Sequence, residues 1–180
     1  MAIINTQPSN VNFLSPLKFT FQMKKLPNVN FFVQQCMLPN IALGRFDIPT
    51  PFVKLPMAGD HLEFREFQLT FRVDEDMKNY KEIYNWMMAL GFPDKFDQYK
   101  ALADKDTRLF RGATGADSLV SDATLIIHNS NVNSNQQITF LNMYPTTIQD
   151  ILFDFRQTDV EYVECLCTFA YERYDIKDIT

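Results

Sequence analysis

Residues 56–93 read PMAGDHLEFREFQLTFRVDEDMKNYKEIYNWMMALGFP, and this stretch decides the fold class. Apolar and polar side chains alternate over residues 63–73, which predicts a half-buried β-strand. An acidic triplet at residues 74–76 follows, and carboxylates are favoured at a helix N-terminus. Apolar residues then recur at helical spacing as far as Leu90, and Gly91 is expected to end the helix. The stretch therefore predicts one strand followed by one amphipathic helix, with no catalytic constellation inside it.

The predicted strand and helix each turn one face to the protein interior. On the strand, Phe67, Leu69 and Phe71 share the apolar face. The opposite face is polar and balanced in charge, so we expect it to meet water: Glu66, Gln68, Thr70 and Arg72. The helix is expected to pack into the core through an aromatic and methionine stripe and the tryptophan beside it: Tyr80, Ile83, Tyr84, Trp86 and Met87.

The composition fits a single domain over residues 1–180, which is long enough to bury a sizeable core. Seventeen phenylalanines and seven tyrosines supply enough aromatic volume to fill a sheet-on-sheet interior. The net charge of −5 argues against gripping nucleic acid, because that binding needs clustered Lys and Arg. DNA passing nearby is not excluded, since a mildly acidic wall repels phosphate rather than holding it.

The cysteines and the N-terminus indicate where the protein is made. Cys36, Cys165 and Cys167 lack the number and the spacing of a disulfide framework or a zinc site. We expect them to be small buried hydrophobes in a reducing cytosol. No signal peptide is evident, and the longest apolar run is far too short to cross a membrane. We therefore expect synthesis in a cytoplasm and no membrane partner.

The first third of the chain predicts an arm, a hairpin and a loop. Residues 1–15 form a polar arm without a partner in its own domain. Residues 18–24 and 31–38 are expected to pair as a β-hairpin. Residues 39–56 contain four prolines, so we expect an extended surface loop with edge pairing only at residues 45–48. Such a long loop is usually functional or held by a neighbour.

The last third predicts two more hairpins. Residues 123–128 and 137–142 are expected to pair around an asparagine-rich loop. Residues 144–148 are interpreted as a turn. Residues 151–155 and 160–174 are expected to form the last hairpin, whose second strand is long for a globular domain.

Nothing in the chain indicates an active site or a metal centre. Residues 92–121 form a variable insertion, and its loop at residues 111–115 lacks the strand and helix that a phosphate cradle needs. His61 and His128 are the only histidines, too few for a three-histidine metal site, and no spacing suggests a catalytic triad. We expect no enzyme activity, no cofactor and no metal.

The order of motifs is specific enough to name a family. The motifs are FFVQQC at residues 31–36, MAGD at residues 57–60, the helix that carries Trp86, YPTT at residues 144–147, and the final strand through residues 163–171. In this order, over residues 18–175, the chain resembles the tail tube proteins of contractile-tailed bacteriophages. It departs from the family in a longer N-terminal arm and in residues 92–121. Those departures leave open whether it is the main tube subunit or a relative at the end of the tube.

The resemblance implies a mainly β fold: an antiparallel β-sandwich or barrel-like tail-tube domain with one flanking helix. It also implies hexameric rings that stack into a hollow tube, in which sheets join between subunits. The candidate lumen-facing residues are then the polar strand face: Glu66, Gln68, Thr70 and Arg72. The implied partners are further copies of the chain, the tail sheath protein, the baseplate tube initiator and the tail terminator. The resemblance further implies that DNA passes through the lumen without specific binding and that the protein resides in the virion tail after assembly in the host cytoplasm.

The arm at residues 1–15 and the loop at residues 39–56 are expected to contact the next subunit or ring. The candidate contact residues are the apolar side chains of these two segments: Ile3, Ile4, Phe13, Leu14, Phe46, Ile48 and Phe52. An arm that orders only on assembly would restrain polymerisation until an initiator forms the first ring.

Three alternatives remain open beside the main tube subunit. The first is a baseplate tube initiator or a tube-terminating protein of the same fold. The second is the tube subunit of a contractile injection or secretion machine. The third is a monomeric binding module with a β-barrel pocket, which predicts one stable species in solution and an apolar cavity.

Overall fold

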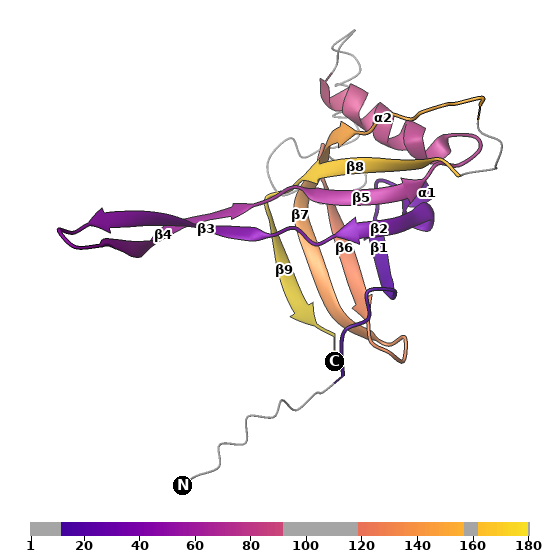
Figure 1. The fold of residues 1–180 in the computed structure, drawn as a ribbon. Coiled ribbons are helices and arrows are strands. Elements are labelled where there is room, and N and C mark those ends of the chain that lie inside the picture. Colours follow the sequence, from indigo (N-terminus) through magenta and orange to yellow (C-terminus); the bar gives the residue numbers. More distant parts are fainter. Residues whose placement is uncertain (1–11, 92–118, 157–161, 180) are drawn as a thin grey trace.

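The computed structural model describes residues 12–91, 119–156 and 162–179, and in these ranges the protein is mainly β (Figure 1). The elements in chain order are β1 (Phe19–Met23), α1 (Pro27–Phe32), β2 (Val33–Met37), β3 (Ile41–Pro49), β4 (Lys54–Phe64), β5 (Phe67–Arg72), α2 (Lys78–Gly91), β6 (Ser121–His128), β7 (Ser134–Ile148), β8 (Glu164–Ala170) and β9 (Arg173–Asp178). The expected fold class is confirmed. The described residues also contain a second, short helix, α1, that the sequence pattern did not predict.

Seven strands form one antiparallel sheet in the order β1-β6-β7-β8-β5-β2, with β9 paired to β7 beside this path. The path is linear, so the sheet remains open rather than closing into a barrel. In Figure 1, β1, β6, β9 and most of β7 form one layer, and β8, β5 and β2 cross it as a second layer. β3 and β4 form a separate two-stranded sheet that projects away from both layers (Figure 1).

β7 connects the two layers, because it belongs to both. Up to Leu141 it pairs with β9, and from Tyr144 onward it pairs with β8. Between these partners Asn142 adopts a φ of 53°, in the left-handed region that asparagine tolerates better than most residues. The Asn142 backbone N–H donates to Asp122 Oδ1 at 3.0 Å, and its Nδ2 donates to Glu172 Oε2 at 2.6 Å. Side chains from β6 and from the β8–β9 link therefore hold this corner.

The corner also changes which side of β7 faces the core. Ile138 and Phe140 are buried before it, and Met143 and Pro145 are buried after it. An uninterrupted strand would bury every second residue without a change of phase. The extra residue at Asn142 shifts the phase, so both halves of β7 direct side chains into one interior.

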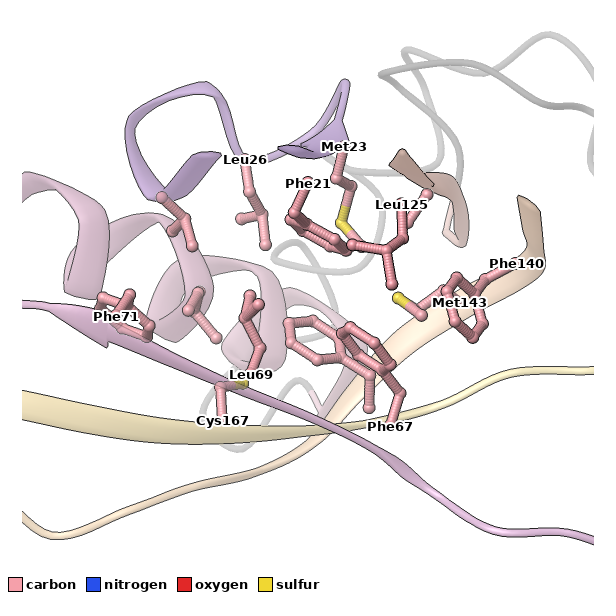
Figure 2. Close-up of a cluster of buried hydrophobic side chains, with 14 of the residues drawn as sticks. Phe21, Met23, Leu26, Phe67, Leu69, Phe71, Leu125, Phe140, Met143 and Cys167 are labelled. Carbon is pink, nitrogen blue, oxygen red and sulfur yellow. The ribbon is translucent and has the colours of Figure 1, made fainter. Parts of the chain in front are cut away.

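The core lies between the two layers and is dominated by aromatic and sulfur-containing side chains (Figure 2). The Phe67 ring from β5 lies 4.8 Å from that of Phe140 and 5.6 Å from that of Phe21, measured between centroids. Each fully buried phenylalanine contributes roughly 1.5–3 kcal/mol through removal of apolar surface from water. Cys165 and Cys167 are buried in β8, as expected, whereas Cys36 in β2 is only half-buried.

Helix α2 covers one end of this core. Of the helix residues expected in the core, Ile83 and Trp86 are buried, and Tyr80 and Met87 are half-buried against it. Tyr84 differs, because it is 46% exposed and lies on the outer side of the helix. The Trp86 indole N–H donates to the Leu119 carbonyl at 3.0 Å, which connects α2 to the chain just before β6.

Asn79, in the first turn of α2, is fully buried and connects the helix to β5. Its Nδ2 donates to the Arg72 carbonyl at 2.7 Å, and its Oδ1 accepts from the Asp74 N–H at 3.2 Å. One amide side chain thus satisfies a backbone donor and a backbone acceptor where the strand turns into the helix.

The hairpin expected from residues 18–24 and 31–38 is wrong. β1 pairs with β6 and β2 pairs with β5, so the two strands lie at opposite ends of the sheet path. Helix α1 separates them, with Pro27 in its first turn, where the fixed φ of proline suits a helix. The Asn30 side chain closes the turn with two hydrogen bonds. Its Oδ1 accepts from the Met23 N–H, and its Nδ2 donates to the Met23 carbonyl.

The extended loop expected at residues 39–56 is also wrong, since most of it forms the β3–β4 hairpin. The expected edge pairing at residues 45–48 is confirmed, and it continues over the whole of β3. Pro49 and Pro56 are tolerated because each strand of a two-stranded ribbon is an edge strand.

Two strand boundaries also differ from the sequence prediction. The strand expected at residues 63–73 is divided, because Phe64 ends β4 and β5 begins at Phe67. The turn expected at residues 144–148 is the last part of β7, where the chain pairs with β8.

The last predicted hairpin is absent from the described residues. Residues 151–155 form no strand, and the long final strand is divided into β8 and β9 at residues 171–172. Of the insertion at residues 92–121, residues 92–118 lie outside the described residues.

We predict that Asn79→Ala lowers the free energy of unfolding by about 2 kcal/mol, because it leaves a backbone carbonyl and N–H without their buried partner. The measurement is a urea unfolding curve followed by circular dichroism. Tyr84→Ala is the matched control on the same helix, and its exposed side chain should leave the midpoint nearly unchanged. Equal midpoints for Asn79→Ala and the wild type would contradict this role.

Candidate assembly surface

The β3–β4 hairpin carries the largest group of exposed apolar side chains among the described residues. It extends from the body as a narrow ribbon, with its tip far from the core (Figure 1). Its exposed large apolar residues are Ile41, Leu43, Phe46, Ile48, Phe52, Val53, Leu55, Met57 and Leu62. Scattered exposed apolar residues are normal, but a contiguous group marks an interaction surface.

The outer half of the hairpin has one apolar face and one polar face. Phe46 lies opposite Met57 and Ile48 lies opposite Leu55, and directly opposed residues share a face. The other face carries Arg45 and Asp47, whose Nε and Oδ1 atoms lie 3.3 Å apart. An apolar face of this kind normally covers a core, and a two-stranded ribbon is only marginally stable alone. We refer to Phe46, Ile48, Leu55 and Met57 as the ribbon face.

Two glycines let the hairpin strands cross closely where the pairing register shifts. A Cβ on Gly59 would lie 2.6 Å from the Gly44 carbonyl oxygen, which is a backbone clash. A Cβ on Gly44 would meet nothing nearer than 3.6 Å, an ordinary contact. The MAGD motif in the sequence therefore has a structural reason, since only glycine fits at position 59.

The polar side chains of β5 lie on the sheet surface opposite the core. Gln68 and Thr70 are half-buried on this face, and Arg72 is exposed at its end. Arg72 Nε lies 3.6 Å from Glu164 Oε1 of β8, and its guanidinium lies 5.0 Å from the centre of the Tyr162 ring. Glu66 is exposed in the link between β4 and β5, not on the strand. Their assignment to a lumen stays a prediction.

The candidate contact residues of the arm are only partly described. Phe13 is 97% exposed and Leu14 is also exposed, in the segment before β1. Ile3 and Ile4 lie outside the described residues. In the hairpin, Phe46 and Ile48 belong to the ribbon face and Phe52 lies at the tip. The three hairpin candidates thus lie on one ribbon, whereas the two described arm candidates, Phe13 and Leu14, lie beside the β6–β7 loop.

The sheet has open ends as well. In the described part of the chain, β1 and β2 each pair with one strand only, so each leaves one row of backbone groups unpaired. Open edges of this kind are templates for pairing with another chain. They add a second kind of contact site to the ribbon face.

The structure offers little reactive chemistry. Burial raises the pKa of the Cys36 thiol to about 11 and the pKa of the Cys165 thiol, so neither forms a reactive thiolate readily. The described residues contain no cluster of three or more His, Cys, Asp or Glu side chains able to hold a metal ion. In the same ranges, neither helix has the length and apolarity to cross a membrane.

The chain matches the family model described as phage tail tube protein over residues 6–177. The protein belongs to this tail tube family. Its members are structural components, so the ribbon face and the open sheet edges are surfaces of a tail tube protein. The sequence matches none of the curated proteins.

Solved structures share the tail tube fold at low sequence identity. The anti-feeding prophage tube-terminating cap is 14% identical, with a TM-score of 0.57 over 99% of this chain and 100% of that chain. The sheath–tube complex of an extracellular contractile injection system is 12% identical, with a TM-score of 0.55 over 94% of both chains. The anti-feeding prophage baseplate is 11% identical, with a TM-score of 0.60 over 93% of this chain and 97% of that chain.

The sequence analysis named Phe46 and Ile48 as contact residues but missed Leu55, Met57 and the two strands that form the ribbon face, although a signal was present. Phe46 and Ile48 alternate with charged residues before the turn, and Leu55 and Met57 alternate with proline and alanine after it. The turn is closed by the Val53 N–H, which donates to Thr50 Oγ1 at 3.1 Å. The four prolines obscured this period-two pattern.

We predict that Gly59→Ala opens the hairpin without unfolding the core, because the new methyl group displaces the backbone of Gly44. The measurement is limited chymotrypsin digestion, which should cut at Phe46 or Phe52 several times faster than in the wild type. Gly44→Ala is the matched control and should digest at the wild-type rate. Unchanged digestion of Gly59→Ala would show that the crossing does not hold the hairpin.

Proposed function

We propose that this tail tube family member is the main tube subunit of a contractile phage tail. Six copies close into a ring, and the rings stack into a hollow inner tube that conducts DNA within the contractile sheath. The observation that carries the proposal is the ribbon face, an apolar surface that a single copy exposes to water. Burying it against further copies recovers the stabilisation that a lone hairpin lacks.

The polar surface of the layer formed by β2, β5 and β8 supports a lumen role. Gln35 lies opposite Thr70, and Gln68 lies opposite Thr168, on the side of these strands away from the core. The net charge of −5 suits a wall along which DNA slides, because like charges repel phosphate. In this proposal Glu66 and Arg72 line the ends of the same surface.

The proposal makes other copies, the tail sheath, a baseplate initiator and a tail terminator the partners of the chain. It involves no enzyme activity and no cofactor. The protein is synthesised in the host cytoplasm and functions in the virion.

A tube initiator or a tube terminator is the second candidate function. The observation in its favour is that the cap and baseplate structures share the fold at TM-scores of 0.57 and 0.60, beside 0.55 for the sheath–tube complex. Copy number separates the candidates, because an initiator or terminator occupies one ring and a tube subunit many. A contractile injection machine without a phage genome would use the same subunit geometry.

We predict that the purified protein forms six-fold rings or tubes in negative-stain electron microscopy, and that Phe46→Ser combined with Ile48→Ser abolishes them. The polar variant removes apolar area from the ribbon face but leaves the core intact. Val132→Ser, at an exposed apolar residue on the β6–β7 loop, is the control and should assemble normally. Dispersed wild-type monomers at high concentration would contradict the proposal.

We further predict that deleting residues 1–15 changes ring stacking, because the arm restrains polymerisation until it orders on a formed ring. The measurement is the tube length distribution in micrographs, with and without preformed rings as seeds. Without seeds, the truncated protein should form longer tubes than the full-length protein. The same lengths for truncated and full-length protein would show that the arm has no such role.

A further inference from the structure

A cavity of about 870 Å³ is lined by residues of α1, β2 and the turn between β5 and α2. The β3–β4 hairpin extends away from these elements (Figure 1). The cavity opens where α1 passes into β2 and where β5 ends, beside residues 151–153. Its apolar lining includes Phe31, Val73, Met77, Ile151, Phe153 and Tyr162. Phe31 is 83% exposed and Phe153 is 75% exposed, so these rings stand around an open site rather than filling it.

The rim of this cavity is acidic. Asp74 and Glu75 lie on it, at the turn between β5 and α2. Arg72 is also on the rim, but Glu164 lies 3.6 Å from its Nε, so the positive charge is matched locally. The site is therefore an aromatic hollow with surplus negative charge at its edge.

The tip of the hairpin has the complementary character. Phe52 is 97% exposed, and Val53 beside it is also exposed. Lys54 is the only charged residue between residues 48 and 59. An apolar tip with one cation matches an apolar cavity with an acidic rim.

The topology places tip and cavity at opposite ends of the same two strands. The hairpin leaves the body after Met37 at the end of β2 and returns at Phe67, the start of β5. The cavity is lined by Gln34 and Arg72, at the other ends of these strands. β3 alone spans about 30 Å at 3.3 Å per residue. The β3–β4 hairpin extends away from α1 (Figure 1), and Phe31 of α1 lines the cavity. One copy therefore cannot place its tip in its own cavity.

We propose that this cavity receives the β3–β4 tip of a second copy, with Phe52 between Phe31 and Phe153 and Lys54 beside Asp74 and Glu75. The contact is head-to-tail, and repeated head-to-tail contacts generate rings or helical filaments. The inference rests on the proposed self-assembly and names the receiving site within it. An aromatic anchor in a water-excluding pocket is the usual centre of binding energy in an interface.

The first experiment is a double-mutant cycle on self-association, measured by sedimentation velocity. Phe52→Ala and Phe153→Ala should each weaken association about thirtyfold, the size expected for an interface anchor. The double variant should be no weaker than either single variant, because both remove one contact. Phe155→Ala is the matched control, since Phe155 is fully exposed but does not line the cavity. Multiplied effects in the double variant, or an equal effect of Phe155→Ala, would overturn the proposal.

The second experiment is disulfide trapping, which does not depend on rings. Chains carrying Phe52→Cys and Phe153→Cys, each with Cys36→Ser and a different tag, are co-expressed and oxidised with copper phenanthroline. The expected product is the mixed dimer of the two chains, at least tenfold above that obtained when Val132→Cys replaces Phe153→Cys. Dimers of Phe153→Cys with itself, or no mixed dimer, would overturn the proposed contact. If tubes form without the mixed dimer, the proposed function stands and this contact is overturned. If the mixed dimer forms without rings, this contact stands and the proposed function is overturned.

Discussion

The corner of β7 at Asn142 is the constraint on which the rest of the structure depends. One strand serves both layers, and it does so only because a single residue takes a left-handed backbone conformation. That conformation costs on the order of 1 kcal/mol, and the carboxylates of Asp122 and Glu172 offset it by accepting hydrogen bonds from the corner. Without the shift of phase, Phe140 and Met143 would point to opposite sides and the layers would not share a core.

Because the corner joins the two layers around one core, the molecule divides into a two-layered body and the β3–β4 hairpin outside it. The two layers, with α2 over one end, form a self-sufficient core that needs no disulfide or metal among the described residues. The hairpin lies outside that core and gains little from it. Its ribbon face consists of large apolar side chains, as a protein core does, but these side chains are exposed to solvent. The chain therefore separates the part that forms the core from the part that we propose to assemble with other copies.

The sequence predicted the elements whose period is regular and failed where a residue breaks the period. The strand β5 is predicted because Phe67, Leu69 and Phe71 alternate with polar residues. The helix α2 is predicted because Tyr80, Ile83 and Met87 recur at helical spacing. The end of β7 is predicted to be a turn because YPTT has turn composition. Its partner β8 lies about twenty residues further along the chain, and nothing in the local sequence indicates that pairing. β1 and β2 were paired together for a similar reason, since neighbours in sequence usually pair and nothing local specifies β6 or β5 as partners.

The candidate site was predicted in part. The segment at residues 39–56 was selected as an assembly contact, although its strands were not foreseen, and its exposed Phe46, Ile48 and Phe52 remain the candidates. The cavity around Phe31 and Phe153 had no sequence signal, because its walls come from segments more than a hundred residues apart.

The way the hairpin joins the body has a consequence for how this family can vary. β2 and β5 are adjacent strands, with Met37 opposite Gln68, so the ribbon enters and leaves the sheet at one place. Adding or removing one opposed pair of residues lengthens or shortens it by about 3.3 Å and leaves every core contact unchanged. Insertions or deletions in the hairpin can therefore change the reach of each subunit in regular increments, while the body to which it is attached stays the same.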